Sequence, residues 1–246
     1  MKTSGKRVLI TGGGAGIGLA MAQAFMNADS HVVICGRTMS TLEQAQRAHP
    51  KLEIAQCDVT DDEQIIALHD RCLTDFGGID ILVNNAAIIH RFDMTNGSLP
   101  LKDQIKEYDI NLGGPIRVTH HFLPQLFNRP EAAIVNLTSA LAFMPTVASP
   151  IYSATKAALR SWTISLRTQL ADTNVKVFEL IPPLVDTQMN DNYDAGGVRK
   201  MSPEAHASHF MKGFAKDRLE IAVGISRGLP LLSRIAPKAV FSILNR

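Results

Sequence analysis

The stretch LITGGGAGIGLA, residues 9–20, decides the fold of this chain. The apolar run KRVLI (6–10) leads into it and has the composition of a buried strand. The segment GLAMAQAFMNA (18–28) follows it with helical spacing. A strand, a glycine-rich turn and a helix, in this order, are the context that a dinucleotide-binding turn requires.

Three glycines of the turn, Gly12, Gly16 and Gly18, fit the pattern TGxxxGxG. Gly12 is expected to allow the tight turn out of the strand, and Gly16 to let a pyrophosphate approach the backbone. Gly18 is expected to let the helix pack closely on the sheet. The start of that helix offers unpaired N–H groups and a positive dipole end to phosphates. The alternative, a merely flexible turn, is disfavoured by the strand and helix on either side.

Further strands and helices alternate along the rest of the chain. Strands are expected at 31–35, 52–57, 79–85, 132–139 and 175–181, and helices at 40–49, about 61–75, 102–127 and 152–171. The strands are apolar runs, as in parallel strands that are buried on both faces. The sequence therefore predicts a single α/β domain, residues 1–246, with a mostly parallel sheet covered by helices on both sides. Ligands of such sheets bind beyond the carboxyl ends of the strands.

The composition fits a globular protein, with 46% hydrophobic and 20% charged residues among 246. A formal net charge of +2 without a long basic run gives nucleic acid no evident binding surface. Cys35, Cys57 and Cys72 include no CxxC pair and are expected to be reduced thiols. With no apolar leader at the N-terminus and no apolar run of membrane-spanning length, we expect a cytoplasmic protein.

The end of the second expected strand bears on the choice of nucleotide. In VVICGRT (32–38), Gly36 stands where an NAD-binding protein usually carries an acid for the ribose 2′-hydroxyl, and Arg37 follows. A guanidinium can hold a 2′-phosphate through two hydrogen bonds, whereas a carboxylate would repel it. These residues favour NADP over NAD, with Thr38 as a further hydroxyl contact. The alternative is that Arg37 is a solvated surface side chain.

Two further strand ends carry polar residues, each with two possible roles. Asp58, in CDV at 57–59, could bond the adenine or cap the helix that starts near Asp61. NNAA at 84–87 ends the fourth strand, where small residues let the backbone lie against a cofactor. Asn84 could instead be structural and bond neighbouring backbone.

Tyr152 and Lys156, in PIYSATKAALRSW (150–162), are four residues apart and are therefore expected on the same face of a helix. A free phenol has a pKa of about 10 and is a poor base at neutral pH, but a nearby ammonium favours the phenolate. Bringing this pKa to about 7 takes about 4 kcal/mol of differential stabilisation. A phenol tuned in this way can donate a proton to a carbonyl oxygen while hydride arrives at the carbon.

Ser139 and Asn111 are the expected helpers of this pair. Ser139 ends the fifth expected strand, and its hydroxyl could hold the oxygen of a substrate. Asn111 lies within the expected helix 102–127, where asparagine is a poor helix former. A buried amide at this position suggests a polar task, such as holding a water molecule in a proton path.

Taken together and in this order, these motifs resemble those of the short-chain dehydrogenases/reductases. The resembling residues are TGGGAGIG at 11–18, NNAA at 84–87, Asn111, Ser139 and YSATK at 152–156. Within that family, VVICGR, TSALAFMP and ELIPPLVDT most resemble the DltE-like bacterial oxidoreductases. The resemblance covers essentially the whole chain and implies a Rossmann-type, doubly wound sheet. It also implies hydride transfer between NAD(P) and a carbonyl or secondary alcohol.

The resemblance further implies a role for each site residue. Tyr152 is the catalytic acid/base, and Lys156 lowers its pKa and bonds the nicotinamide ribose. Ser139 orients the substrate, and Asn111 supports a water relay. The implied cofactor contacts are Thr11, Gly12, Gly16, Ile17, Gly18, Arg37, Asp58, Val59, Asn84, Ala86, Tyr152, Lys156, Pro182 and Thr187.

Members of this family are commonly dimers or tetramers built through their long helices. The helices at 102–127 and 152–171 are therefore expected to pair across an interface of a homodimer or homotetramer. Ala158, Trp162 and Leu166 recur every four residues and offer more apolar surface than one contact needs. The alternative is that these second faces meet solvent.

Two departures from the family's pattern concern the cofactor pocket. Ala87 stands where the fourth-strand motif usually ends in glycine. After the sixth strand, Pro182 and Pro183 replace the usual Pro-Gly, and the second proline stiffens the turn and removes an N–H. Thr187 remains available to contact the nicotinamide carboxamide.

The residues expected to flank the reacting carbonyl are mostly apolar and suggest a hydrophobic ketone or secondary alcohol. They are Ile88, Ile89, Leu141, Phe143, Met144 and Met189, of which Leu141 and Met189, with Ser139 and Tyr152, are the expected substrate contacts. His90 and Arg91 are expected at the rim, the alternative being that they bind an acidic substituent. No metal site is expected, because His120 and His121 have no metal-binding spacing with other ligands.

Two C-terminal segments depart from the alternation of strands and helices. Residues 184–212 are polar and contain two adjacent glycines, which predicts a mobile substrate lid. Residues 226–246 are basic, with apolar residues at helical spacing interrupted by Pro237. This tail is expected to pack on its own domain or on a partner subunit, and attachment to an anionic membrane is the less favoured alternative.

Two other functions stay open on the same fold. One is a nucleotide-binding regulator or scaffold without turnover, which the presence of both Tyr152 and Lys156 disfavours. The other is an epimerase or dehydratase that uses a bound cofactor.

Overall fold

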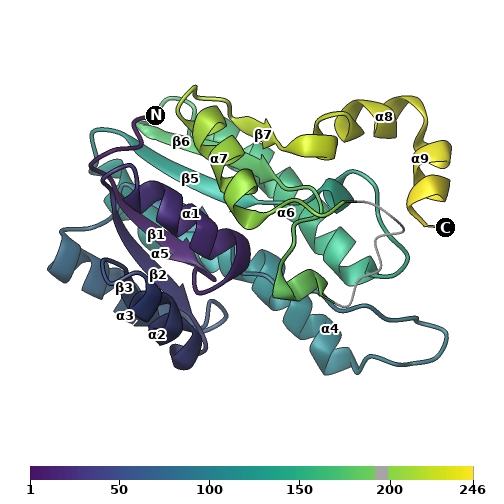
Figure 1. Ribbon diagram of the computed structural model, residues 1–246, viewed down its shortest axis with the longest axis horizontal. Coiled ribbons are helices and arrows are strands. Elements are labelled where there is room, and N and C mark those ends of the chain that lie inside the picture. Colours follow the sequence, from purple (N-terminus) through teal and green to yellow (C-terminus); the bar gives the residue numbers. More distant parts are fainter. Residues whose placement is uncertain (192–198, 246) are drawn as a thin grey trace.

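A parallel sheet lies between two layers of helices in the computed structural model, which describes residues 1–191 and 199–245 (Figure 1). Its strands are β1 Arg7–Thr11, β2 His31–Gly36, β3 Glu53–Gln56, β4 Ile81–Asn84, β5 Ala132–Leu137, β6 Val175–Ile181 and β7 Glu220–Ala222. They are ordered β3-β2-β1-β4-β5-β6-β7, and all neighbouring strands are parallel. The chain reverses its direction of winding between β1 and β4, which places a ligand crevice at their carboxyl ends. The predicted Rossmann-type α/β fold is confirmed.

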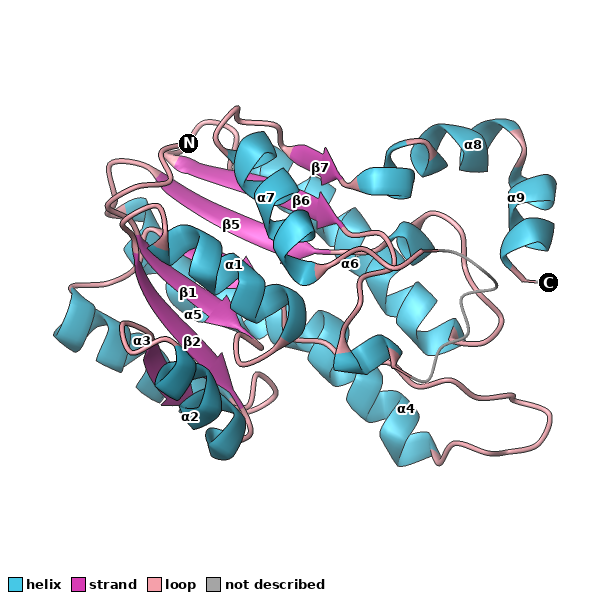
Figure 2. Cartoon of the chain, viewed as in Figure 1, coloured by secondary structure: helices cyan, strands magenta, loops and turns pink. Residues whose placement is uncertain are grey.

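The larger helices cover both faces of the sheet, and the two C-terminal helices project beyond it (Figure 2). The helices are α1 Gly16–Met26, α2 Met39–Ala48, α3 Asp62–Phe76, α4 Leu101–Tyr108, α5 Gly114–Phe127, α6 Pro150–Gln169, α7 Pro203–Phe214, α8 Leu229–Ile235 and α9 Pro237–Leu244. Apolar residues of α1, α2 and α7 form one buried cluster, and those of α3, α5 and α6 form the other. Successive residues of β1 point to opposite faces of the sheet, so that Val8 and Ile10 belong to the first cluster and Leu9 to the second.

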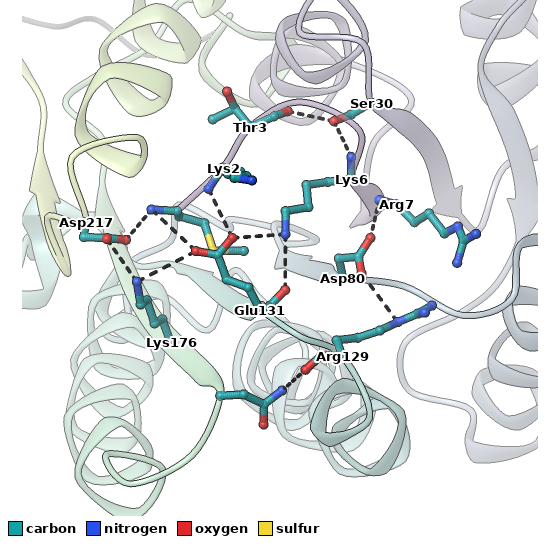
Figure 3. Close-up of polar contacts among 12 residues, drawn as sticks. Lys2, Thr3, Lys6, Arg7, Ser30, Asp80, Arg129, Glu131, Lys176 and Asp217 are labelled. Atoms are coloured by element: carbon teal, nitrogen blue, oxygen red, sulfur yellow. Dashed lines mark hydrogen bonds and ion pairs between the residues drawn. The ribbon is translucent and has the colours of Figure 1, made fainter.

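The amino ends of the strands are joined by polar contacts (Figure 3). The Lys6 ammonium lies 3.1 Å from a Glu131 carboxylate oxygen, and the Lys176 ammonium lies 3.0 Å from Asp217. Asp80 accepts a hydrogen bond from the Arg7 backbone N–H at 2.8 Å. These contacts are at the edge opposite the carboxyl ends of the strands, where the predicted site residues gather.

The predicted helix 102–127 is interrupted. Between α4 and α5 the chain forms a π-helical turn, η1, over Asp109–Gly113, and Asn111 lies within it. The physical reason is Pro115, which has no N–H to donate to the carbonyl one turn earlier. Single π-helical turns are frequent at functional sites, and here the turn carries a candidate site residue.

The second half of the predicted lid is a core helix and not a lid. Ser202 caps the start of α7 by accepting a hydrogen bond from the Ala205 N–H at 3.2 Å, and Pro203 occupies the first helical position. Phe210 and Phe214 are fully buried against α1. β7, which the sequence reading also missed, follows this helix. Residues 192–198 of the predicted lid lie outside the described residues.

The C-terminal tail forms two short helices, and Pro237 begins α9 at a position where proline is tolerated. Apolar side chains of α8 remain exposed, Leu231 by 63% and Ile235 by 71%. The tail touches its own domain through Asn245, whose side chain accepts from the Val147 N–H at 2.7 Å and donates to the Pro145 carbonyl at 3.2 Å. Over the described residues, none of the helices combines the length and apolar character that a membrane span needs.

The apolar stripe that predicted a subunit interface packs largely on its own domain. Leu166 is buried, and Trp162 packs against the cluster under α3, α5 and α6. Exposed apolar side chains lie on α4, α5 and α6, with Ile105 56%, Ile116 39% and Ile164 41% exposed.

Candidate active site

The glycine-rich turn is packed against the end of β4. A Cβ at Gly18 would lie 2.5 Å from the Gly12 carbonyl oxygen, and a Cβ at Gly12 would lie 2.9 Å from the Ala86 Cα. Both neighbours are backbone and cannot move aside. Gly12 also has φ +64°, in the left-handed region that favours glycine. Because these positions carry no side chains, the turn packs closely against α1 and the end of β4 and leaves its other side open to a cavity.

Thr11 and Asn85 tie the turn to the fourth strand. The Thr11 hydroxyl accepts hydrogen bonds from the backbone N–H groups of Asn85 and Ala86 at 3.0 and 3.1 Å. The Asn85 amide donates to the carbonyls of Thr11 and Gly12, both at 2.9 Å. The sequence reading singled out Asn84 and missed Asn85. The missed signal was that Asn84 still belongs to the buried strand, whereas Asn85 is the first residue beyond it.

Asn84 lies below the crevice and does not line it. Its amide donates to the Asn136 side-chain oxygen at 2.8 Å and to the Thr119 hydroxyl at 3.1 Å. These partners are side chains of β5 and α5, not the neighbouring backbone that the structural alternative predicted. Asn84 therefore supports the strand ends from within the core.

A crevice runs over the turn as two adjoining cavities of about 340 and about 240 Å³. Gly12, Ala15, Ala86 and Ala87 line both. The first cavity extends to Arg37, Thr38, Asp58 and Val59, and the second to Gly16, Ile17, Tyr152, Lys156, Pro182 and Thr187. Most of the predicted cofactor residues are thus brought together along one elongated crevice, with Thr11 and Gly18 supporting its floor. Its length and its glycine floor fit a dinucleotide.

Arg37 and Asp58 border the far end of the crevice. Arg37 is exposed, and among the described residues its guanidinium forms no ion pair within 4.0 Å. Asp58 accepts hydrogen bonds from the Thr60 N–H at 3.0 Å and hydroxyl at 2.8 Å. It does not cap the helix, because Asp61 does so by accepting from the Gln64 N–H at 3.1 Å. The capping alternative for Asp58 is therefore wrong, and its adenine contact remains a prediction.

Tyr152 and Lys156 lie side by side at the other end. The Lys156 ammonium is 5.6 Å from the centre of the Tyr152 ring, and both residues line the second cavity. The ammonium donates to the Leu137 carbonyl at 2.8 Å, where β5 ends. The same-face arrangement expected from the spacing is present, and the ammonium keeps further N–H donors beside the cavity.

Burial dominates the acid–base properties of this pair. It raises the pKa of Tyr152 to about 12, with the Ser139 hydrogen bond acting in the opposite direction. Burial also lowers the pKa of Lys156 to about 8. That Lys156 lowers the phenol pKa remains a prediction. Its ammonium is directed at the Leu137 carbonyl, and burial lowers its own pKa.

Ser139 and Asn111 hold the surroundings of Tyr152 in place. The Ser139 hydroxyl accepts from the Leu141 N–H at 3.1 Å and stands at the start of a short helical turn. The Asn111 side chain exchanges two hydrogen bonds with the Ile88 backbone, both at 2.8 Å, and donates to the Thr155 hydroxyl at 3.3 Å. Asn111 therefore connects the loop after β4 to α6. Its part in a water relay remains a prediction.

The substrate side of the crevice is less uniformly apolar than expected. Met189 lines the catalytic cavity and a neighbouring cavity of about 530 Å³. Met144 is buried. The Arg160 guanidinium lies over the Phe143 ring, 4.3 Å from its centre. The neighbouring cavity is lined by Arg37, Ala87, Ile88, Ile89, His90, Arg91, Asp103, Lys106, Gln188 and Met189. His90 and Arg91 are thus cavity-lining residues at the edge of the reaction crevice.

Glu107 is a buried carboxylate beside this site that the sequence reading missed. It is fully buried, and its Oε2 accepts from the His90 backbone N–H at 3.1 Å and lies 2.8 Å from the His90 ring Nδ1. Burial raises the pKa of this carboxyl above its ordinary value. The available signal was its position one helical turn before Asn111, on the same face. Over residues 1–191 and 199–245, no cluster of three or more His, Cys, Asp or Glu side chains could hold a metal ion.

The family model described as short chain dehydrogenase matches residues 6–196. An uncharacterized oxidoreductase, DltE, of Bacillus subtilis is 39% identical over all of this chain and 98% of its own length. An uncharacterized oxidoreductase of Staphylococcus saprophyticus is 33% identical over 81% of this chain and 86% of its own.

Two solved structures share the fold at lower identity. A short chain dehydrogenase from Burkholderia cenocepacia, in complex with NADP, has a TM-score of 0.87 at 22% identity and covers 99% of both chains. A short chain dehydrogenase/reductase from Burkholderia phymatum, in complex with NAD, has a TM-score of 0.84 at 21% identity and covers all of this chain and 97% of its own. With the crevice and its tyrosine–lysine pair, these matches show that the chain belongs to the NAD(P)-dependent short-chain dehydrogenase family of oxidoreductases.

Proposed function

We propose that this protein is an NADP(H)-dependent oxidoreductase that interconverts a ketone and a secondary alcohol. One observation carries the proposal: the same crevice is bordered by Arg37 at one end and by Tyr152 and Lys156 at the other. A 2′-phosphate at the first end and a reacting carbonyl at the second are the two groups that these side chains suit.

When bound, the dinucleotide supplies or accepts the hydride. The N–H groups at the start of α1 would bind its pyrophosphate beside Gly16, whose missing side chain leaves room for Thr187 at the same cavity. The spare N–H donors of Lys156 bind the adjacent ribose. Pro182 and Thr187 close the nicotinamide end of the crevice.

Tyr152 handles the proton. In its neutral form, which burial favours, the phenol donates to the carbonyl oxygen as reduction proceeds. The Ser139 hydroxyl holds that oxygen, and Asn111 keeps the loop after β4 in register with α6. Met189 and Leu141 supply apolar contacts to a hydrophobic substrate.

Replacing Arg37 by alanine tests the cofactor preference. A charge-assisted, bidentate contact to a phosphate contributes about 1.5–3 kcal/mol, so the affinity for NADPH is expected to fall roughly 10- to 100-fold. The affinity for NADH is expected to stay unchanged, because NADH has no 2′-phosphate. The rise in melting temperature with each nucleotide measures both affinities, because the stabilisation increases with the ratio of free ligand concentration to Kd.

Arg47 provides the control for this measurement. Its side chain is 71% exposed on α2 and pairs with Glu43, away from the crevice. Arg47→Ala should bind NADPH as the unaltered protein does. Equal loss of both nucleotides in Arg37→Ala, or no loss of either, would refute a 2′-phosphate contact.

We further infer a cytoplasmic homodimer or homotetramer built through α4 and α5. The support is the exposed apolar surface of these helices, including Leu101 at 71% and Ile105 at 56%. The family resemblance favours these helices together with α6.

A further inference from the structure

Glu107 differs from other buried carboxylates near the crevice because one of its two carboxylate oxygens has no hydrogen-bond partner among the described residues. Its Oε2 is bonded to the His90 backbone and lies near the His90 ring, but its Oε1 is buried without a hydrogen-bond partner among the described residues. An unpaired buried acceptor is costly, and it becomes satisfied when a proton or a water molecule occupies it. The carboxyl is therefore placed to take up a proton.

The alignment of α4 with α6 places Glu107 close to Tyr152. Since all strands are parallel, the helices that follow them on one face run in the same direction. Asn111 is bonded to Thr155 of α6 at 3.3 Å. One turn earlier on both helices, Glu107 comes opposite the start of α6, where Tyr152 lies. Glu107 is close enough for its charge to raise the phenol pKa.

His90 connects the buried carboxyl to the surface. Its ring Nδ1 lies 2.8 Å from Glu107 Oε2, while its side chain is 32% exposed. His90 also lines the cavity of about 530 Å³ beside the crevice. One ring nitrogen thus faces the buried carboxyl, and the ring remains accessible to water. Histidine changes its charge near neutral pH, which suits it to pass protons inward.

We propose that His90 and Glu107 form a proton-relay pair that supplies Tyr152 from the cavity beside the crevice. The proposal rests on the proposed reductase function. Both residues act through Tyr152 and are therefore positioning residues for its proton, not catalytic residues.

The relay conserves protons in each cycle of reduction. Tyr152 loses its hydroxyl proton to the substrate oxygen. The Glu107 carboxylate takes the Nδ1 proton of the His90 imidazolium and passes it to the phenolate, directly or through a water molecule. The neutral imidazole then takes up a proton from the solvent in the cavity, which restores the starting state. In alcohol oxidation each step runs in reverse.

Several other charged groups act on this region. Arg91, in the same loop as His90, lowers the phenol pKa, and the Lys156 ammonium is 5.6 Å from the phenol ring. Asp103 and Lys106 of α4 line the cavity with His90. Removing the Glu107 charge removes an effect that raises the phenol pKa, while the charge of Arg91 continues to lower it. The pKa of Tyr152 should therefore fall.

Glu107→Gln tests the pair, because it keeps the size of the side chain and removes its ionisation. In the protein without substrate, we expect the phenolate absorbance of Tyr152 to appear about one pKa unit lower than in the unaltered protein. Subtracting the titration of Tyr152→Phe assigns the signal among the three tyrosines of the chain. Asp103→Asn is the control, and it should leave the Tyr152 titration in place because Asp103 is one turn further from Tyr152.

Turnover provides the second readout. We expect kcat of Glu107→Gln to fall roughly 10- to 100-fold, with a changed solvent deuterium isotope effect. His90→Asn keeps a donor toward Glu107 but cannot carry a proton, and it should show a similar loss. His90→Ala should regain activity when free imidazole is added. The shift of the melting temperature with NADPH should stay unchanged in all three variants.

The two readouts separate this proposal from the proposed function. If Glu107→Gln and His90→Asn both keep the original Tyr152 titration and kcat, the relay is refuted. It is also refuted if kcat falls with an unchanged pH profile and imidazole restores nothing, because that is the result of a merely structural contact. If the unaltered protein reduces no ketone, the proposed function fails, and the phenolate titration alone still decides whether Glu107 governs Tyr152.

Discussion

Replacing Tyr152 by phenylalanine is expected to lower kcat for ketone reduction by about 10²- to 10⁴-fold. The change removes one oxygen atom and with it the proton donor of the crevice. The ring remains and still fills its place beside Lys156. Binding of NADPH should therefore survive, because the turn and Arg37 are untouched. Steady-state rates with a panel of ketones, together with the NADPH-induced shift of the melting temperature, measure both expectations.

Tyr108→Phe is the matched control. Tyr108 ends α4 and is 52% exposed, so the loss of its hydroxyl should leave kcat unchanged. Full activity of Tyr152→Phe would show that the phenol is not the proton donor. A protein that binds NADPH but turns over no substrate with Tyr152 intact would favour the regulator or scaffold.

Arg160→Met is expected to destabilise the fold by about 3–5 kcal/mol, because it leaves a buried carboxylate without its cation. Glu179 of β6 is fully buried and pairs with the Arg160 guanidinium. The Thr138 hydroxyl donates to its other oxygen at 2.7 Å. For a chain of this size the melting temperature should fall by roughly 10 °C. Thermal or urea unfolding measures the loss.

The location of this ion pair links stability to the site. Arg160 is one helical turn after Lys156, and Thr138 directly precedes Ser139. The double variant Arg160→Met/Glu179→Gln should recover part of the loss, since it also removes the unpaired charge. Arg47→Met is the control for an exposed pair and should change stability by less than about 1 kcal/mol. A double variant no more stable than Arg160→Met would contradict a charge-based explanation.

The part of the fold that could be predicted from sequence rests on local patterns. The glycines of the turn and the spacing of Tyr152 and Lys156 have direct geometric consequences, and the structure places them along one crevice. The interruption at Asn111 and the helix α7 were missed for a different reason. Each depends on a proline at the start of a helix. The helical pattern around Pro115 hid the start of α5, and the polar pattern before Pro203 hid the start of α7.

Other features depend on tertiary contacts that no local pattern contains. Glu107 belongs to a helix with several charged residues and looks like a solvated side chain until the loop after β4 covers it. The choice between Asn84 and Asn85 depends on the residue at which β4 ends. The acid–base balance of Tyr152 depends on the direction of the Lys156 ammonium and on how deeply both groups are buried.

The central claim is that the crevice converts Tyr152 into a usable acid–base group only when the dinucleotide and Lys156 act on it together. The most direct measurement is the phenolate titration of Tyr152 with and without bound NADP⁺, in the unaltered protein and in Lys156→Met. We predict a pKa of about 12 in the free protein. With NADP⁺ bound it should fall by at least about 2 units, because positive charge favours the phenolate, and Lys156→Met should lose much of that fall. A titration that NADP⁺ leaves unchanged would contradict the account.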